Sequence, residues 1–327
     1  MEYWTMPSYK LLLPLLGLSL IGNLYFALNF KGENSQTNKT EEIQKQNDFQ
    51  FLSKRIFVEN QNDILINFIP LRQAMREYIN KQEGKVGAYF EYLPSGTSIG
   101  VNDKVEIRLA SLSKVPIVMS IFKKIERGQM SPSDMLVIEK NHLDQGFGTL
   151  WKRGEGAELS VQELIELTLI ESDNTAYNVL LGHLTGQELN EVYRSLDISI
   201  TVGTKEDEKY LRVSPKNYSS IFRSLYLSSF LSQNNSNHIL EILTQTTFND
   251  KIAAGVPDTI KVAHKIGTFE GVDTLQNVFI DCGIIYIPNR PYILCAFVLG
   301  TNEEAQKHML YISKAIHEYI TNVEGGN

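Results

Sequence analysis

The chain has 327 residues, of which 43% are hydrophobic and 21% are charged, so it can bury a core and does not have the composition of a disordered or fibrous protein. Its formal net charge is −7. Nucleic-acid binding requires a basic patch or stripe, so this acidic balance argues against a nucleic-acid partner. We expect one domain of catalytic size together with additional segments.

The first segment differs from the rest of the chain. Residues 11–30 are apolar and uncharged, close to the ~20 residues that cross a bilayer core, and Lys10 and Lys31 flank them. A cleavable signal peptide has a similar charged start and apolar centre, but no convincing cleavage site lies near Ala27. We predict a signal anchor or signal peptide over 1–30, favouring the uncleaved anchor, with a buried helix as a third alternative. In the two leading cases the protein is extracytoplasmic, either tethered to the cytoplasmic membrane by this segment or secreted.

A polar linker is predicted next, over 31–62. Residues 31–48 are mostly Asn, Gln, Lys, Glu and Thr, and such a composition cannot offset the entropy lost on ordering. The remaining residues, 63–327, form the predicted folded domain.

Periodicity and turn residues predict the secondary structure of this domain. Apolar residues recur at helical spacing in some segments, whereas β-favouring residues bounded by turn chemistry indicate strands in others. Strands near both ends with a helical middle imply an α+β fold: an antiparallel sheet built from strands near both ends of the domain, with a helical subdomain. The expected helices are 70–81, 111–127, 160–171, 173–184 and 303–319, and the expected strands are 86–92, 97–101, 278–287 and 292–299.

The two cysteines, Cys282 and Cys295, lie on either side of the turn-forming segment Pro288–Pro291. Buried free thiols are the favoured interpretation because cysteine often packs as a small hydrophobe, and a cross-strand disulfide is the alternative. Two cysteines cannot build a disulfide scaffold or a cysteine-rich zinc site. The six histidines show no ligand spacing with acids or cysteines, so we expect no metal and no other cofactor.

A nucleophile is suggested by Ser111 and Lys114, which are three residues apart and therefore share a face of the expected helix. A serine hydroxyl is a poor nucleophile until a base takes its proton, and a lysine can do so where burial or nearby cations lower its pKa. The helix N-terminus also favours negative charge at the serine. Taken alone, the pattern is a weak signal and favours a capping serine beside a solvated lysine.

Two later segments change that interpretation. Ser172-Asp173-Asn174 lies at a helix junction, where in isolation it would be an N-cap cluster. His264-Lys265-Ile266-Gly267-Thr268 leads into the closing strands, and in isolation it would be a strand entry. In this order, Ser-x-x-Lys, Ser-Asp-Asn and Lys-x-Gly resemble the motif set shared by class A β-lactamases and penicillin-binding proteins. The resemblance to this family of active-site serine hydrolases extends from about Val86 to Tyr319.

The resemblance implies acyl-enzyme chemistry. Ser111 would be the acylated nucleophile and Lys114 its proton shuttle. Ser172 would relay a proton towards the leaving nitrogen, assisted by the charge of Lys265. Asn174 would hold the side-chain amide of the substrate and help to orient Lys114.

It also implies a substrate cleft. The backbone N–H groups of Ser111 and Thr268 would form the oxyanion hole, an arrangement that typically supplies several kcal/mol. Gly267 would let a substrate strand approach the sheet closely, Thr268 would help to bind the substrate, and Phe147 lies in a segment that resembles the loop at the rim of the cleft.

Two departures from the family pattern affect the expected activity. Ile266 stands where the family usually has a hydroxyl residue that helps to hold the substrate carboxylate, so weaker carboxylate recognition is expected. Class A β-lactamases also carry a glutamate and a nearby asparagine that position the deacylating water, and no such pair is apparent between Asn174 and Pro215. The acids at 206–208 are interpreted as a solvated turn.

Three functions remain open at this point. The first is a membrane-anchored serine hydrolase or transferase that recognises D-alanyl peptides of peptidoglycan and β-lactams and deacylates slowly, as a penicillin-binding DD-peptidase would. The second is a class A β-lactamase with an unconventional deacylation site. The third is a catalytically weak membrane-bound sensor or scaffold. The related glutaminases share the serine and lysine, but the other motifs and the export signal argue against them.

Overall fold

The computed structural model describes residues 50–53, 66–198, 212–270 and 277–322, and residues 51–327 form one compact unit. The predicted anchor over 1–30, most of the predicted linker over 31–62 and the acidic turn at 206–208 lie outside the described residues. Of the linker, residues 50–53 are described, and Phe51 and Leu52 are buried there. Within the described ranges, no helix combines the length and the apolar character needed to span a membrane.

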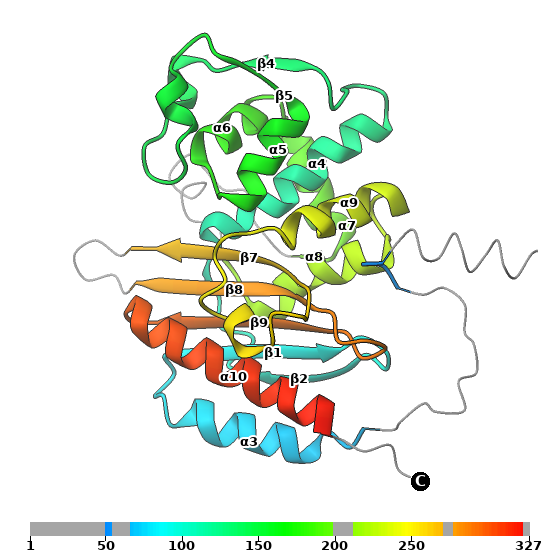
Figure 1. Ribbon diagram of the computed structural model, residues 1–327, viewed down its shortest axis with the longest axis vertical. Coiled ribbons are helices and arrows are strands. Elements are labelled where there is room, and N and C mark those ends of the chain that lie inside the picture. The colour runs from blue at the N-terminus through cyan, green and yellow to red at the C-terminus, as the bar shows by residue number, and fades with distance from the viewer. Residues whose placement is uncertain (1–49, 54–65, 199–211, 271–276, 323–327) are drawn as a thin grey trace, which may run out of the picture. The chain divides into compact units, whose positions relative to one another are not determined.

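A five-stranded antiparallel sheet forms the centre of this unit, which confirms the predicted α+β fold (Figure 1). The two hairpin strands, 86–92 and 97–101, have the predicted bounds. The central strand of the sheet is the one nearest the C-terminus, 292–299, so the sheet forms only when the two ends of the domain come together. The order is β2 (Thr97–Val101), β1 (Val86–Tyr92), β9 (Tyr292–Leu299), β8 (Val278–Ile285) and β7 (Val262–Phe269).

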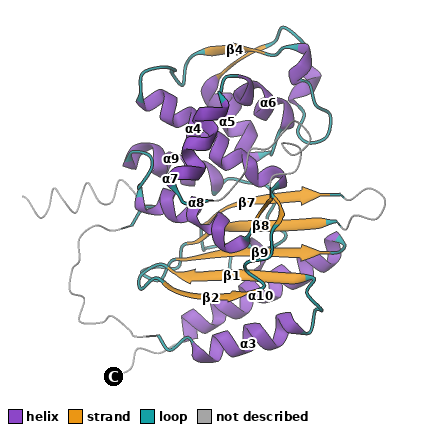
Figure 2. Ribbon diagram, turned by 180° about the vertical axis from the view of Figure 1, so that it is seen from behind, coloured by secondary structure: helices purple, strands orange, loops and turns teal. Residues whose placement is uncertain are grey.

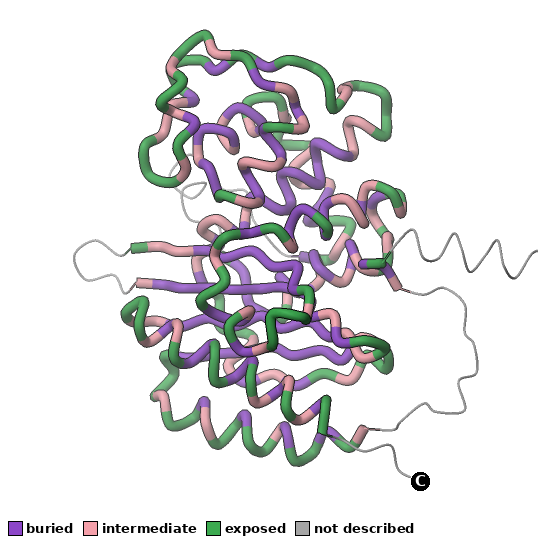
Figure 3. Tube along the Cα trace, viewed as in Figure 1, coloured by how far each residue is buried: buried purple, intermediate pink, exposed green. Residues whose placement is uncertain are grey.

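Two helices cover one face of the sheet. In α3 (Ile69–Asn80) the buried residues Leu71, Met75 and Ile79 are four residues apart, and α10 (Asn302–Asn322) buries a similar stripe. These stripes pack with the inward side chains of β1, β2 and β9 into one hydrophobic core. Figure 3 shows the buried side of each helix turned to the sheet and the exposed side turned away.

The other face of the sheet is covered by α8 (Pro215–Leu227), and the remaining helices gather beyond the edge strand β7 as a helical subdomain (Figure 2). Short elements complete the described part of the unit. The helices of the subdomain are α4 (Lys114–Glu126), α5 (Val161–Ile170), α6 (Asn174–Gly182), α7 (Gly186–Ser195) and α9 (Gln233–Leu243). The short elements are the pairs β3 (Ile107–Arg108) with β6 (Arg212–Val213) and β4 (Met135–Val137) with β5 (Glu158–Ser160), and the 3-10 turns η2 (Ala110–Ser113), η3 (Lys140–His142), η4 (Leu150–Arg153) and η6 (Ala253–Gly255).

Capping decides where the subdomain helices begin. Helix α5 begins at a capping box that Ser160 and Glu163, three residues apart in the sequence, form: the Ser160 hydroxyl accepts a hydrogen bond from the N–H of Glu163, and the Glu163 carboxylate accepts one from the N–H of Ser160. The helix predicted from Ser111 is corrected: its first turn is a 3-10 turn and α4 begins at Lys114. Ala110, the first residue of this 3-10 turn, has a φ of 46°, so the chain bends sharply where it enters the helix. A 3-10 turn is tighter than an α-helical turn and is common at helix N-termini.

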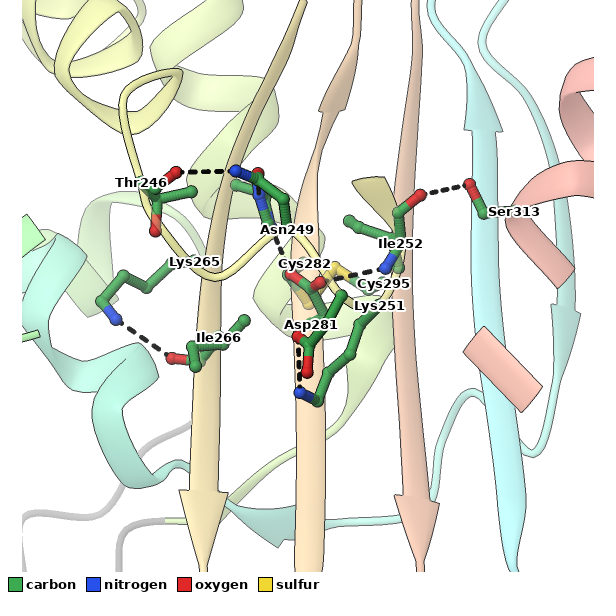
Figure 4. Close-up of polar contacts among 12 residues, drawn as sticks. Thr246, Asn249, Lys251, Ile252, Lys265, Ile266, Asp281, Cys282, Cys295 and Ser313 are labelled. Atoms are coloured by element: carbon green, nitrogen blue, oxygen red, sulfur yellow. Dashed lines mark hydrogen bonds and ion pairs between the residues drawn. A yellow bond between two sulfur atoms is a disulfide. The ribbon is translucent and has the colours of Figure 1, made fainter. Parts of the chain in front are cut away.

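The cysteine interpretation is also corrected. Cys282 and Cys295 form a disulfide, and they are not free thiols (Figure 4). The antiparallel register of β8 and β9 places them directly opposite each other, which the spacing in the sequence alone did not establish. Because β7 pairs Lys265 with Cys282, the disulfide lies on the same face of the sheet as Lys265.

The opposite face of β7 and β8 carries a buried polar cluster. His264 and Asp281 have no exposed surface, and the His264 Nδ1 and Asp281 Oδ1 atoms are 2.8 Å apart. Asn249 Oδ1 lies 3.2 Å from the other ring nitrogen of His264, and the N–H of Ile252 donates to Asp281 Oδ2. Ser313 of α10 donates to the carbonyl of Ile252, so the segment 249–252 is attached to both the sheet and the helix (Figure 4).

We predict that Asp281→Ala lowers the free energy of unfolding by about 3–5 kcal/mol, because it leaves His264 and the Ile252 N–H buried without their acceptor. Denaturant titration measures this loss. The matched control is Glu318→Ala on the exposed side of α10, which we expect to cost at most ~1 kcal/mol. A loss at Asp281 no larger than that of the control would contradict the prediction.

Candidate active site

A pocket of about 330 Å³ lies where the subdomain meets the edge of the sheet. It is open to solvent and is lined from three directions: by η2 and the start of α4, by α6 with the segment 143–150 that follows η3, called the rim loop below, and by the end of β7. Five of the residues predicted from the motifs line it, namely Ser111, Lys114, Phe147, Asn174 and Thr268.

Ser111 and Lys114 lie on one side of the helical turn, and the distance from Lys114 Nζ to Ser111 Oγ is 3.1 Å. Ser111 is half-buried and Lys114 is 2% exposed. The ammonium of Lys114 also lies 2.7 Å from the carbonyl oxygen of Ser172, 3.1 Å from its hydroxyl and 2.7 Å from Asn174 Oδ1. A protonated lysine has three N–H bonds, and four acceptor atoms lie within hydrogen-bonding distance of its nitrogen. Every N–H bond of Lys114 can therefore find an acceptor, which fixes the position of the side chain.

Ser172 lies at the junction of α5 and α6 with a φ of 56°, a left-handed conformation that non-glycine residues rarely adopt. Strained positions of this kind cluster at functional sites. The Ser172 hydroxyl accepts hydrogen bonds from both Lys114 and Lys265, whose Nζ is 2.9 Å away. Since both lone pairs of the oxygen are engaged, its proton is available for donation.

Asp173 holds this junction in place. Its carboxylate is fully buried, accepts from the N–H of Ala176 as the N-cap of α6, and accepts from the N–H of Leu150 in the rim loop. The N–H of Asn174 donates to the carbonyl of Phe147. The rim loop is thereby attached to the same turn that presents Ser172.

Burial depresses the pKa of both lysines. It lowers the pKa of Lys114 to about 8, and the charges of Asp173 and Asp144 oppose this effect. Burial also places the pKa of Lys265 well below its usual value, with a further decrease from the charge of Lys114 and an opposing effect of Asp281. A lowered pKa enlarges the neutral fraction of a lysine near neutral pH, and the neutral amine is the state that can accept a proton.

Gly267 and Thr268 bring β7 beside the nucleophile. A side chain on Gly267 would lie 3.3 Å from the carbonyl of Leu109 and 3.3 Å from the side chain of Leu112. The glycine therefore lets β7 approach the turn that carries Ser111. This close approach lies within the protein and was not predicted, whereas the sequence predicted a close approach of the substrate to Gly267. Ile266 is buried, and its side chain points to the opposite face of the sheet from Lys265.

Asp144, Tyr177 and Phe248 are among the residues at the site that were not predicted. Asp144 Oδ1 accepts a hydrogen bond from Asn174 Nδ2 over 3.0 Å. The ring of Tyr177 lies 5.5 Å from Lys114 Nζ, and the ring of Phe248 lies 5.9 Å from Lys265 Nζ and 6.2 Å from that of Phe147. Helical spacing from Asn174 could have indicated Tyr177. No pattern in the sequence marks Asp144 or Phe248, because their contacts come from distant segments.

Within the described ranges, no group of three or more His, Cys, Asp or Glu side chains is arranged to hold a metal ion. The site offers hydroxyls, two amines, the amides of Asn174 and Asn178 and the carboxylate of Asp144. A serine that can be deprotonated by a neutral lysine, beside a second hydroxyl that can donate a proton, is suited to acyl transfer.

Comparison with known proteins assigns the class. The model of the beta-lactamase enzyme family matches residues 70–320, so the chain belongs to this family, and it is a β-lactamase-like serine hydrolase. Among curated relatives, the beta-lactamase VEB-1 of Pseudomonas aeruginosa is 22% identical over 253 residues, which are 69% of this chain and 82% of the relative. A beta-lactamase of Proteus vulgaris is 25% identical over 245 residues, 71% of this chain and 88% of the relative.

Solved structures share the fold. The TLA-3 extended-spectrum beta-lactamase has a TM-score of 0.72 and 21% identity, covering 78% of this chain and all of that one. The structure of PBP-A has a TM-score of 0.69 and 24% identity, covering 78% of this chain and 97% of that one. The fold is therefore common to β-lactamases and to PBP-A.

The contact between Asp173 and the rim loop can be tested by comparing alanine substitutions at two glycines that both have positive φ, Gly148 and Gly154. A side chain on Gly148 would overlap the carboxylate of Asp173, whereas one on Gly154 would meet nothing within 4 Å. Both alanine variants carry backbone strain of about 1–3 kcal/mol. We expect Gly148→Ala to lose a further ~1–3 kcal/mol of unfolding free energy, because it displaces the buried acceptor of Leu150. Equal losses in the two variants, measured by denaturant titration, would contradict this account of the rim loop.

Proposed function

We propose that this protein is a membrane-anchored, extracytoplasmic acyl-enzyme hydrolase or transferase that recognises D-alanyl peptides and β-lactams, is acylated at Ser111 and releases the acyl group slowly. The observation that carries the proposal is the hydrogen-bonded array of Ser111, Lys114, Ser172 and Lys265, of which Ser111 and Lys114 line the pocket and the other two are buried beside them. The tether is residues 11–30, whose apolar run lies between Lys10 and Lys31.

Acylation follows from this array. Neutral Lys114 takes the proton of Ser111 while Oγ bonds to the substrate carbonyl carbon, and the backbone N–H groups of Ser111 and Thr268 stabilise the resulting oxyanion. Collapse of the adduct breaks the C–N bond. The leaving nitrogen takes a proton from Ser172, which recovers one from Lys114 across 3.1 Å. Lys265, 2.9 Å from the same oxygen, stabilises the negative charge that develops on Ser172.

Substrate recognition relies on the same cleft. A D-alanyl peptide and a β-lactam each offer a reactive amide carbonyl and a carboxylate. In our proposal Lys265 and Thr268 bind the carboxylate, Asn174 binds the side-chain amide, and Phe147 contacts the substrate at the rim. The absence of a hydroxyl at Ile266 weakens carboxylate recognition.

Slow deacylation is supported by the carboxylates. Among the described residues that line the pocket, the only acid is Asp144. Between Asn174 and Pro215 the described glutamates are Glu188 and Glu191, and they form ion pairs with Lys124 and Arg127. PBP-A shares the fold, and a structure of its L158E mutant has been solved as an acyl-enzyme complex with penicillin G.

A second candidate function, that of a class A β-lactamase, is favoured by the curated relatives, which are named as β-lactamases. In that case Glu206 or Glu208, which lie outside the described residues, would activate the deacylating water. A weak sensor or scaffold is disfavoured by the intact hydrogen bonds of Ser111 and Lys114.

Acylation tests the proposal directly. We predict that benzylpenicillin adds one covalent equivalent to the wild type and none to Ser111→Ala, by intact-mass spectrometry. Lys114→Ala and Lys114→Arg should acylate about 10²–10⁴-fold more slowly, because neither can take the serine proton near neutral pH. An adduct on Ser111→Ala, or near-normal rates in either lysine variant, would reject these roles.

The balance between the two half-reactions distinguishes the two enzymes. We predict that a chromogenic cephalosporin gives a burst of one equivalent followed by a slow steady state, the kinetic signature of acyl-enzyme accumulation. Glu206→Gln and Glu208→Gln should leave the slow phase unchanged. Fast turnover without a burst, together with a trapped acyl-enzyme in one of these variants, would establish the β-lactamase alternative.

A further inference from the structure

Asp144 is fastened to the first turn of α6 by both its main chain and its side chain. Its N–H donates to the Thr175 hydroxyl over 3.0 Å, and its carbonyl accepts from that hydroxyl over 3.2 Å. Its carboxylate Oδ1 accepts from Asn174 Nδ2 over 3.0 Å and from the N–H of Gly146 over 2.7 Å. Asp144 is half-buried, lines the pocket, and takes part in no ion pair among the described residues.

These contacts determine which way the Asn174 amide faces. Asn174 Oδ1 accepts from Lys114 Nζ over 2.7 Å, while Nδ2 donates to Asp144. If the amide were reversed, its NH₂ group would face the ammonium and its oxygen would face the carboxylate, and both contacts would be repulsive. Asp144 thereby selects the orientation in which Asn174 accepts from Lys114.

The surroundings of Lys114 make the charge of Asp144 significant. The titratable groups around its Nζ are Asp173 and Tyr177 on the α5–α6 side, Lys265 on β7 and Asp144 on the rim loop. The carboxylate of Asp173 is occupied by two backbone N–H groups. Among these groups, Asp144 is the carboxylate that is linked to Lys114 through a side chain, that of Asn174.

We propose that Asp144 is a positioning residue for acylation: it orients Asn174, places Lys114 against Ser111 through Asn174, and adds a negative charge close to the Lys114 amine. The proposal rests on the proposed function of Ser111 and Lys114. It gives a role to a side chain that none of the motifs contains.

Two substitutions separate the charge from the hydrogen bond. Asp144→Asn keeps an oxygen that can accept from Asn174 but removes the negative charge that opposes deprotonation of Lys114. The acid limb of the acylation profile should therefore move to lower pH, which makes this variant roughly 3–10-fold faster than the wild type at pH 6 and equal to it at pH 9. Asp144→Ala removes both features, so the limb should move in the same direction while the limiting rate at pH 9 falls roughly tenfold.

The experiment follows acylation by benzylpenicillin from pH 6 to pH 9 with rapid-quench intact-mass analysis. Glu318→Gln, an exposed charge change on α10, is the matched control and should reproduce the wild-type profile. In an Asn174→Ala background, Asp144→Ala should cause no further loss of limiting rate, because its positioning effect acts through Asn174. Circular dichroism and thermal melting establish that each variant is folded.

A second measurement does not depend on penicillin. In protein labelled with [¹³C]lysine, the Cε signal of Lys114, identified from its loss in Lys114→Arg, should titrate at lower pH in Asp144→Asn than in the wild type. The proposal is overturned if Asp144→Asn and the wild type show the same Lys114 titration and the same pH profile of acylation. It is also overturned if Asp144→Asn is acylated normally and then stays trapped as the acyl-enzyme, because Asp144 would then be the base for deacylation. If the wild type forms no adduct at all, the proposed function fails while the titration still decides whether Asp144 controls Lys114.

Discussion

The burial of two lysine ammonium groups against one serine hydroxyl is the constraint on which the site depends. Lys114 and Lys265 are 2% and 0% exposed, and both donate to Ser172 Oγ. No ion pair among the described residues involves either lysine. A buried charge without a paired counter-charge costs several kcal/mol, so both amines are displaced towards their neutral forms. The same burial that costs stability makes an amine able to accept a proton.

The fold supports this arrangement with anchors that are adjacent in the chain to the residues they hold. Asp173 follows Ser172 and joins the α5–α6 junction to the rim loop. His264 precedes Lys265 and, with Asp281, joins β7 to β8 and to the segment before η6. Both acidic anchors are fully buried, and each of their carboxylate oxygens has a hydrogen-bond partner. Such networks are rigid, because each member loses its partner if the backbone shifts.

Acylation and deacylation make different demands on this scaffold. The groups proposed for acylation are buried and have fixed hydrogen bonds, whereas hydrolysis needs a carboxylate directed at a water in the open pocket. The carboxylate that lines the described pocket, Asp144, is directed at Asn174 and Gly146. A change in the acids around the pocket can therefore alter turnover without rebuilding Ser111 and Lys114. This separation is consistent with one fold that includes both β-lactamases and PBP-A.

The sequence by itself determined the features that depend on near neighbours: the bounds of the hairpin strands, the capping box at Ser160 and the three motifs with their order. Periodicity, turns and caps act over about four residues, so they can be read along the chain. Only the tertiary structure decided that Cys282 meets Cys295 and that Asp144 meets Asn174. The strand register sets the first contact and the path of the rim loop sets the second. Both join segments that are separated by 13 to 30 residues, and no local pattern encodes such a distance.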